Sequence, residues 1–222
     1  MARVVMKVGG RVAGQSVDLV RERVAAGDEV VVVHGAGPQI TAELEAQGIP
    51  VLFVRGRRFT DAATLTVVRA SLVAVGAELA AALGPFAIQL VGDEIGFEAT
   101  HVPEFGLVGE PLQCRPQAVV SALAQGLVPV VTPIAAGPLN VNADEAATAL
   151  AAGIGADRVV FVTDVPGVYL EGAVLPVIDA DRATELLDAD VFEGGIVPKL
   201  MAAVRAARLG VAVEIGETAV IA

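Results

Sequence analysis

The sequence predicts an α/β protein, a three-layer αβα sandwich whose central sheet is mostly parallel. Short apolar segments rich in β-branched residues alternate with segments of helical spacing along the chain. Residues 30–33 are four consecutive valines with no polar position, which is typical of a strand covered by helices on both faces. A chain of 222 residues with 55% hydrophobic content has the size of one domain or two closely joined lobes and can form a large core.

The elements of the N-terminal half follow from where the apolar runs stop. The first run ends at Gly9 and Gly10, and the valine run ends at His34, after which Pro38 stands at the position where proline favours a helix start. In order, we expect strand 4–8, helix 17–26, strand 30–33, a helix from Pro38, a hairpin at 49–59 carrying Arg55, Arg57 and Arg58, helix 61–83 and strand 86–91.

The C-terminal half continues the alternation after an irregular rim. Residues 97–111 mix glycine, proline and short apolar pairs, as β-hairpins at the edge of a domain do. After these hairpins we expect, in order, helix 116–125, strand 127–134, a helix introduced by residues 139–145 and ending at Gly153, strand 158–163, helix 181–187, a helix from the Gly194-Gly195 pair to about Leu209, and strands 211–215 and 219–221.

The long helix at 61–83 has two possible settings. Thr60 and Asp61 are suited to cap its N-terminus. Its body is apolar on most of its circumference, which indicates burial on more than one side. A subunit interface and an internal core helix both account for this pattern, and the sequence leaves them open.

Composition excludes several classes of protein. The net charge of −11 argues against nucleic acid, which binds through clustered lysine and arginine, but local cations and helix N-termini still permit a phosphate ligand. Glycine, proline, glutamine or charge interrupts every candidate for an apolar span, and Lys7 lies inside the first apolar run, so we expect no membrane helix and no signal peptide. The single cysteine, Cys114, excludes an internal disulfide and a thiolate metal cluster, which favours a cytoplasmic protein.

Lysine is almost absent from the chain. The basic residues are arginine everywhere except at Lys7 and Lys199, and each lysine lies close to a glycine pair. Because lysine is a compact point charge and arginine a planar fork, the two surviving lysines indicate places where a small cation meets an anion. The alternative is a chance result of composition.

The glycine-rich turns are candidates for binding phosphate. Ligands of open α/β sheets gather beyond the carboxyl ends of the strands, where glycines 9–10, 35–37 and 167 are expected. Neither lysine follows a glycine, so the chain has no Walker motif, and the Gly-x-Gly at 35–37 lacks the third glycine of the dinucleotide fingerprint. The common phosphate-binding motifs are therefore excluded.

Eight segments in order resemble the amino-acid kinase family, and within it the acetylglutamate kinases, over nearly the whole chain. The segments are KVGG at 7–10, VHGAGPQI at 33–40, RFTD at 58–61, GFEAT with GLVGEP at 96–111, LVPVVTPIA at 127–135, NVNADEAA at 140–147, FVTDVPGVY at 161–169 and GGIVPKL at 194–200. The resemblance implies an enzyme of arginine biosynthesis that transfers the γ-phosphoryl group of ATP, with Mg²⁺ carried by the nucleotide phosphates, to the side-chain carboxylate of N-acetyl-L-glutamate. It also implies two lobes, with acceptor binding and dimerisation in 1–139 and nucleotide binding in 140–222.

The resemblance assigns a role to each matched residue. Lys7 would neutralise oxygens passing between donor and acceptor, Lys199 would lie on the side of the leaving nucleotide, and Asp144 would orient both lysines. The acceptor would be bound by Gly35, Ala36, Arg58, Asn140 and Asn142. The phosphates and nucleotide would be bound by Gly9, Gly10, Gly37, Asp164, Gly167 and Gly195. No residue is expected to hold a metal.

Structural explanations stand beside these roles. Asn142 and Asp144 fit a helix N-cap and a first-turn acid, Arg58 fits a solvated arginine on a hairpin, and His34 fits a hydrogen-bonded histidine at a strand end. Lys199 is harder to explain in this way, because a cation in the first turn of a helix opposes the macrodipole and needs an anion beside it.

The sequence also departs from the family pattern. Ala36 replaces the middle glycine of a trio, the chain starts at the first strand, and residues 215–221 run almost directly into the last strand. From these ends we expect a homodimer formed through the 61–83 helix, without feedback by arginine. The alternative functions are a kinase of carrier-linked aminoadipate or glutamate, and a non-catalytic subunit that senses amino acids or nucleotides.

Overall fold

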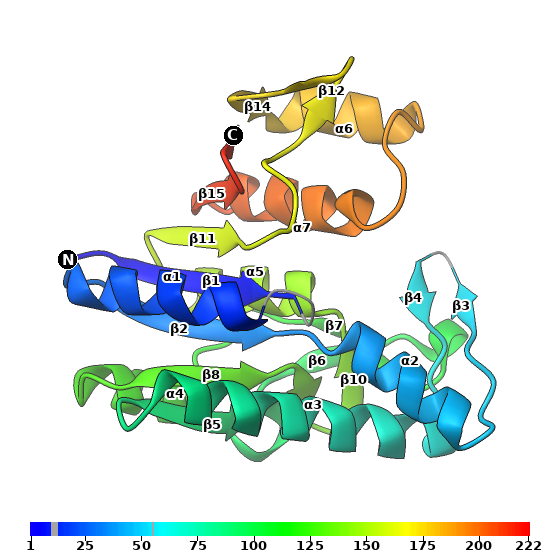
Figure 1. The fold of residues 1–222 in the computed structure, drawn as a ribbon. Helices are drawn as coiled ribbons and strands as arrows, with labels where there is room; N and C mark the ends of the chain where they lie inside the picture. The colour runs from blue at the N-terminus through cyan, green and yellow to red at the C-terminus, as the bar shows by residue number, and fades with distance from the viewer. Residues whose placement is uncertain (10–12, 55) are drawn as a thin grey trace.

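The computed structural model describes residues 1–9, 13–54 and 56–222. One eight-stranded sheet crosses the molecule (Figure 1). Its strands are, in chain order, β1 (Arg3–Val8), β2 (Glu29–His34), β5 (Ala87–Val91), β8 (Val128–Thr132), β11 (Arg158–Phe161), β14 (Val177–Asp179), β15 (Ala212–Ile215) and β16 (Thr218–Ile221). They lie side by side in the order β14-β16-β15-β11-β1-β2-β8-β5.

The sheet is mostly parallel, which confirms the predicted fold class. Neighbouring strands from β15 to β5 all run in one direction, whereas β16 is antiparallel to β15 and β14 is parallel to β16. β1 lies at the centre, with Lys7 opposite Phe161 of β11 on one side and Val33 of β2 on the other. The carboxyl ends of these three strands therefore meet at one edge of the sheet, where ligands of such folds bind.

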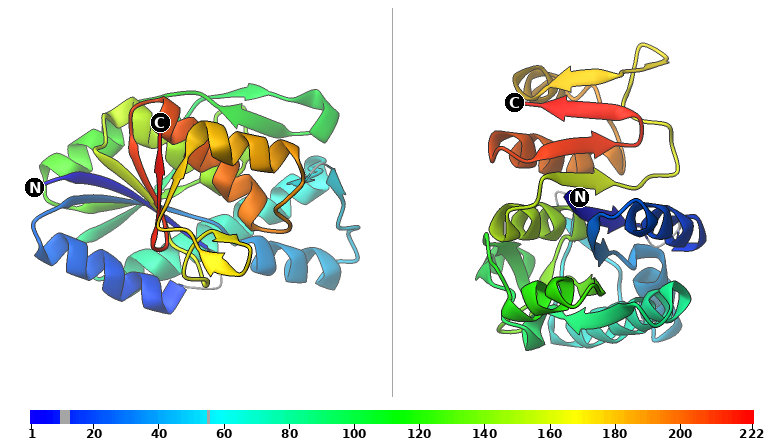
Figure 2. Two further views of the ribbon diagram at one scale, coloured as in Figure 1. Left: turned by 90° about the horizontal axis from the view of Figure 1, so that it is seen from above. Right: turned by 90° about the vertical axis from the view of Figure 1, so that its left-hand side faces the viewer.

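Helices cover both faces of the sheet (Figure 2). The helices of the described chain are α1 (Ala13–Ala25), α2 (Gly37–Ala46), α3 (Ala62–Leu83), α4 (Gln117–Ala124), α5 (Ala143–Ile154), α6 (Ala180–Asp188) and α7 (Ile196–Arg208). Alternate strand residues enter two cores: Val5 and Val31 pack with residues of α4, α5 and α7, whereas Val4 and Val30 pack with residues of α1 and α3. This alternation is why the central strands are apolar at nearly every position.

Smaller sheets form the rim. One contains β6 (Ala99–His101), β7 (Val108–Pro111), β9 (Ile134–Ala135) and β10 (Leu139–Val141), and two hairpins pair β3 (Phe53–Val54) with β4 (Arg57–Arg58) and β12 (Tyr169–Leu170) with β13 (Ala173–Val174). Short 3₁₀ turns lie at Gly92–Glu94 and Pro103–Phe105. The hairpins predicted at 49–59 and 97–111 are confirmed.

α3 is buried on one side only. Asp61 caps it by accepting a hydrogen bond from the Thr64 amide at 2.8 Å, as predicted. One face enters the core, whereas Ala70, Ala74 and Ala77 are exposed. By length and composition α3 is the one described helix that could cross a membrane, with a mean hydropathy of 1.6, but 33% of that window is buried inside the molecule. Its place beside the sheet is that of one layer of the sandwich.

Some short elements are not predicted from the sequence. β10, β12, β13 and β14 are absent from the predicted strands, because segments of two or three residues show no measurable alternation. The first helix, predicted from residue 17, begins at Ala13 as α1. The predicted lobe boundary at 139/140 stays a prediction, since the large sheet and its main core contain residues from both sides of it.

Candidate active site

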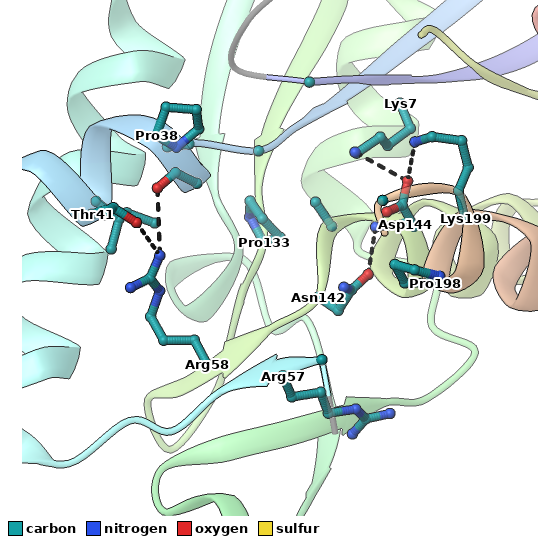
Figure 3. A pocket seen from close by; sticks show the side chains of 18 of the residues that line it. Lys7, Pro38, Thr41, Arg57, Arg58, Pro133, Asn142, Asp144, Pro198 and Lys199 are labelled. Atoms are coloured by element: carbon teal, nitrogen blue, oxygen red, sulfur yellow. Dashed lines mark hydrogen bonds and ion pairs between the residues drawn. The ribbon is translucent and has the colours of Figure 1, made fainter. Parts of the chain in front are cut away.

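A cleft of about 1060 Å³ lies beyond the carboxyl ends of β1, β2 and β11 (Figure 3). Its walls come from α2, the β3–β4 hairpin and the N-termini of α5 and α7. Twelve of the residues that the sequence analysis proposes line it, namely Lys7, Gly9, Gly35, Ala36, Gly37, Arg58, Asn140, Asn142, Asp144, Asp164, Gly195 and Lys199.

Two of the proposed residues are not in this lining. Gly10 lies outside the described residues. Gly167 is placed elsewhere for a packing reason, since a Cβ atom there would lie 2.4 Å from Thr218 Oγ1 and 2.9 Å from Val174 Cγ1. The glycine is therefore explained by the close approach of the C-terminal hairpin, whereas Val165 of the same loop does reach the cleft.

The two lysines meet at one carboxylate in the cleft. Lys7 Nζ and Lys199 Nζ each lie 3.0 Å from Oδ1 of Asp144. All three side chains are buried, with residue exposures of 8%, 8% and 6%. The predicted proximity of Lys7 and Lys199 is thus found in the structure, with residues 192 positions apart in the chain brought to the same oxygen atom.

Burial and charge act in opposite directions on this trio. Burial raises the pKa of the Asp144 carboxyl, but the charges and hydrogen bonds of the two lysines outweigh it and hold that pKa below its usual value. Burial lowers the pKa of Lys199, the charge of Lys7 adds to this, and Asp144 opposes both. One carboxylate therefore neutralises only one of two cations, and the trio keeps a net positive charge that can attract an anion.

Local structure explains how Lys199 and Asp144 reach each other. Lys199 lies in the first turn of α7, where the helix dipole opposes a cation, and its ammonium group lies 5.6 Å from the centroid of the Phe161 ring. Asp144 lies in the first turn of α5, where the dipole favours an anion. The anion expected beside Lys199 is therefore Asp144.

Asn142 caps α5, which confirms the structural explanation for this residue. Its side-chain oxygen accepts hydrogen bonds from the backbone amides of Asp144 at 2.9 Å and Glu145 at 3.1 Å. Because the cap uses only the oxygen, the amide nitrogen of Asn142 remains the group that can donate to a ligand in the cleft. The cap and the proposed acceptor contact are compatible.

Arg58 is held against the opposite wall. Its Nη2 lies 2.8 Å from the hydroxyl of Thr41 and 3.4 Å from the carbonyl of Gly37, and its guanidinium lies 4.7 Å from the Phe53 ring centroid. Its other terminal nitrogen, Nη1, is buried without a hydrogen-bond partner among the described residues. Burial lowers the pKa of the Arg58 guanidinium. Arg58 therefore lines the cleft and is held there by these contacts, rather than being free in solvent as the structural explanation expects.

The remaining proposed residues lie between these groups. The amide nitrogen of Asn140 donates to the hydroxyl of Thr60 at 3.0 Å, so Asn140 is fixed against the end of the hairpin. A Cβ at Gly37 or Gly195 would meet nothing within 4 Å, and one at Gly35 would only touch Ala143 at 3.6 Å. Space therefore remains beside these backbones for a ligand.

His34 is buried behind the cleft under α3. It is 1% exposed, and its Nε2 lies 3.3 Å from Thr132 Oγ1, while Nδ1 has no partner among the described residues. Burial lowers the pKa of His34 to about 4, so the ring is neutral at pH 7. Gly76 of α3 makes room for it, because a Cβ there would lie 2.7 Å from Nε2.

The sequence analysis overlooks four side chains that shape the site. Thr41 and Phe161 contact Arg58 and Lys199, respectively, and Arg57 forms an ion pair with Glu145 at 2.7 Å. One pattern in the sequence could have indicated the role of Arg57. Side chains alternate along a strand, so Arg57 and Arg58 are expected on opposite faces of the hairpin.

The model of the amino acid kinase family matches residues 2–216. Curated acetylglutamate kinases are similar to this chain over most of its length. The one from Rubrobacter xylanophilus is 37% identical over 97% of this chain and 88% of its own, and the one from Saccharopolyspora erythraea is 39% identical over 95% and 78%.

Solved structures share the fold. The crystal structure of smu.665 from Streptococcus mutans UA159 superposes with a TM-score of 0.91 at 28% identity and covers 99% of this chain and 98% of its own. Carbamate kinase from Giardia lamblia bound to AMP-PNP gives a TM-score of 0.75 at 16% identity over 99% and 98%, which shows the fold alone. With the family model spanning nearly the whole sequence and the curated relatives above 30% identity, the chain belongs to the amino acid kinase family.

Proposed function

We propose that the chain is an ATP-dependent kinase that phosphorylates the side-chain carboxylate of N-acetyl-L-glutamate. The observation that carries the proposal is the buried Lys7–Asp144–Lys199 trio at the floor of a cleft whose other wall presents Arg58. The acceptor is chosen because the curated relatives at 37% and 39% identity are named acetylglutamate kinases.

The reaction needs charge stabilisation more than proton transfer. An oxygen of the acceptor carboxylate forms a bond to the γ-phosphorus of ATP, the bond from that phosphorus to the β–γ bridging oxygen breaks, and ADP leaves with the electron pair. A glutamate side chain has a pKa of about 4.3 and is ionised at neutral pH, so no general base is required. The site must hold two anions in line and shield the charge between them.

The lysines supply that shielding. Lys7, at the end of the central strand, is proposed to neutralise the oxygens of the migrating phosphoryl group, and Lys199 the oxygens of the departing nucleotide. Asp144 contacts both ammonium groups at 3.0 Å and is proposed to orient them rather than to accept a proton. Because these charges are fixed before the substrates bind, little reorganisation accompanies the reaction.

The acceptor is proposed to lie between Arg58 and the start of α5. Arg58 lines the cleft, and its guanidinium fork can bind a carboxylate of the acceptor through two hydrogen bonds. The side chains of Asn140 and Asn142 and the backbones of Gly35 and Ala36 are proposed to hold its main chain. Gly9, Gly37, Asp164 and Gly195 are proposed to serve the phosphates and nucleotide.

Mg²⁺ is proposed to enter with the nucleotide. The described residues contain no cluster of three or more His, Cys, Asp and Glu side chains able to hold a metal ion, and Asp144 is already engaged by two lysines. Mg²⁺ would then be held by the phosphates of ATP, and it would neutralise part of their charge.

We also propose that the enzyme is a cytoplasmic homodimer formed through α3. Its exposed face is rich in alanine, including Ala70, Ala74 and Ala77, with Glu78 beside them, and small residues let two helices approach closely. The neighbouring edge strand β5 has no charged residue, and such an edge is usually protected by a partner. The low number of cysteines fits a reducing compartment.

The test is the release of ADP with N-acetylglutamate compared with glutamate, aspartate, UMP and carbamate. We expect turnover with N-acetylglutamate alone among these acceptors. Turnover with another acceptor would contradict the proposal, and nucleotide binding without ADP release would favour the sensing alternative. Release only with a carrier-linked acidic amino acid would favour the other kinase, which the relatives do not support.

A further inference from the structure

The β3–β4 hairpin contacts both walls of the cleft through consecutive arginines. Successive side chains of a strand point to opposite faces, so Arg57 and Arg58 of β4 point apart. Arg58 reaches Thr41 of α2 at 2.8 Å, whereas Arg57 reaches Glu145 of α5 at 2.7 Å. Figure 3 shows the two guanidinium groups directed away from each other. The direction of Arg58 is therefore coupled to the position of Arg57.

The Arg57–Glu145 pair is partly withdrawn from water. The side chains are 25% and 20% exposed, and the Arg57 guanidinium lies 5.5 Å from the centroid of the Phe105 ring. Phe105 is buried, and its carbonyl accepts a hydrogen bond at 2.9 Å from the amide of Thr60, two residues after β4. Arg57 therefore packs on the same rim segment that fixes the end of the hairpin, and its charge is screened less than that of an exposed arginine.

Glu145 does not form the usual capping hydrogen bond with α5, the helix that contains it. A glutamate three residues after an N-cap commonly bonds back to the N-cap amide, but the carboxylate of Glu145 instead contacts Arg57. Its second oxygen has no partner in the described part of the chain. Burial raises the pKa of Glu145, and the charge of Arg57 opposes that rise. Arg57 is thus the main compensation for placing this carboxylate under the hairpin.

We propose that the Arg57–Glu145 ion pair positions the acceptor-binding arginine, by tying β4 to the N-terminus of α5 so that Arg58 faces the cleft. The inference rests on the proposed role of Arg58 in binding the acceptor. Without the pair, β4 loses its side-chain tie to α5, and the direction of Arg58 then depends on its own contacts with Thr41 and Gly37. The residues of α7 and of the loop after β11, which form the nucleotide side, are not partners in this ion pair, so we expect that side to change less.

The experiment measures both Michaelis constants in Arg57→Met and Glu145→Gln. Methionine keeps an apolar stem over Phe105, and glutamine keeps the shape of Glu145. We expect the KM for N-acetylglutamate to rise about tenfold in each, with kcat and the KM for ATP changing less than about twofold. Because both residues act through one contact, the double variant should be no worse than the worse single variant. Arg57→Lys, which keeps the charge, should recover most of the loss.

The matched control is Arg208→Gln, which breaks the ion pair of Arg208 with Asp181. That pair joins α7 to α6 at 2.8 Å and is 50% and 86% exposed, so its loss should leave all three constants unchanged. An unchanged acceptor KM in Arg57→Met and Glu145→Gln, or equal losses in all constants, would overturn the proposal. So would additive effects in the double variant.

A second measurement separates this inference from the proposed function. Hydrogen exchange of the β4 amides should be faster in Arg57→Met than in the wild type, and unchanged in Arg208→Gln. If the wild type does not phosphorylate N-acetylglutamate, the proposed function fails, while the exchange comparison still tests the pair. Equal exchange of β4 in the wild type and Arg57→Met would overturn the positioning role whatever the substrate.

Discussion

Asp144 determines how each member of the central trio responds to substitution. Both ammonium groups contact the same oxygen, so removing either lysine leaves an ion pair behind, whereas removing Asp144 leaves two cations facing each other in a buried site. An uncompensated buried charge is far more costly than a lost half of a shared interaction. Substitution of a lysine should therefore affect mainly activity, whereas substitution of Asp144 should affect mainly stability.

We predict that Lys199→Met lowers kcat by about 10²–10³, which is the usual effect of removing one group that stabilises transition-state charge. The free energy of unfolding should fall by less than about 1.5 kcal/mol, because Lys7 still pairs with Asp144 and the methionine stem still packs near Phe161. Steady-state kinetics and urea denaturation test this. By contrast, Asp144→Ala should lower the free energy of unfolding by about 3–5 kcal/mol. Equal losses of turnover and stability in Lys199→Met would assign that lysine a structural role.

His34 predicts a pH dependence of stability. The unfolded chain protonates this ring below its ordinary pKa of 6.5, whereas the folded protein, with a pKa of about 4, does not until the pH is much lower. Protons therefore favour the unfolded state, and stability is lost as the pH falls from 6.5 to about 4. This loss is about 3 kcal/mol at 1.36 kcal/mol per pKa unit. Denaturation midpoints of the wild type at pH 7 and pH 4 measure it.

The comparison for this effect is His34→Gln, which does not titrate. Between pH 7 and pH 4 its free energy of unfolding should fall by about 3 kcal/mol less than that of the wild type, since the carboxylates contribute equally to both proteins. An identical acid dependence in the two proteins would show that burial does not hold the ring neutral.

Among the elements, the C-terminal hairpin positions the loop on the nucleotide side. Thr218, at the start of β16, is fully buried, accepts a hydrogen bond from the Val168 amide at 2.9 Å and donates one to the Leu175 carbonyl at 2.6 Å. The Glu217 amide donates to the Pro166 carbonyl at 2.6 Å. The loop that presents Asp164 to the cleft is thus bound, at Pro166 and Val168, to the start of β16 and the turn before it.

We predict that Thr218→Val raises the KM for ATP several-fold and leaves the KM for the acceptor unchanged. Valine keeps the volume but leaves a buried amide and a partly buried carbonyl without these partners, which should cost about 1–3 kcal/mol of stability. Kinetics with each substrate varied in turn, together with urea denaturation, provide the test. Thr184→Val is the control. Its hydroxyl donates to the Ala180 carbonyl of α6 and accepts from Arg208 of α7, and neither partner belongs to the loop that presents Asp164. A rise in the acceptor KM as well would contradict the prediction.

The features of the structure that can be predicted are those with a clear pattern in the sequence. The long helices are predicted because their periodicity extends over many residues, and the valine strand because it is apolar throughout. The cleft is predicted because glycines follow the neighbouring strands β1 and β2. Lys7 and Lys199 are found because lysine is rare in this chain. The pair of Arg57 with Glu145 joins residues 88 positions apart, and nothing local to either residue shows the other.

In the whole molecule, the large sheet unites both halves of the chain. β1 and β2 come from the N-terminal half and β11 and β15 from the C-terminal half, yet they are neighbours in one sheet. Lys7 from the first half and Lys199 from the second therefore reach one carboxylate. The sheet ends at β5, beside the exposed face of α3, and this end is the one proposed to meet a second copy.

The last prediction concerns this assembly. Two copies related by a twofold axis would place the same α3 face of each against the other, so one added carboxylate appears twice in the interface. Ala74→Glu should therefore convert a dimer into a monomer, because two like charges would be buried close together. Light scattering after size exclusion at micromolar concentration measures the mass, and circular dichroism checks the fold. Ala124→Glu, on the exposed side of α4, should leave the dimer intact. A monomeric wild type, or a dimeric Ala74→Glu, would place the interface elsewhere or exclude it.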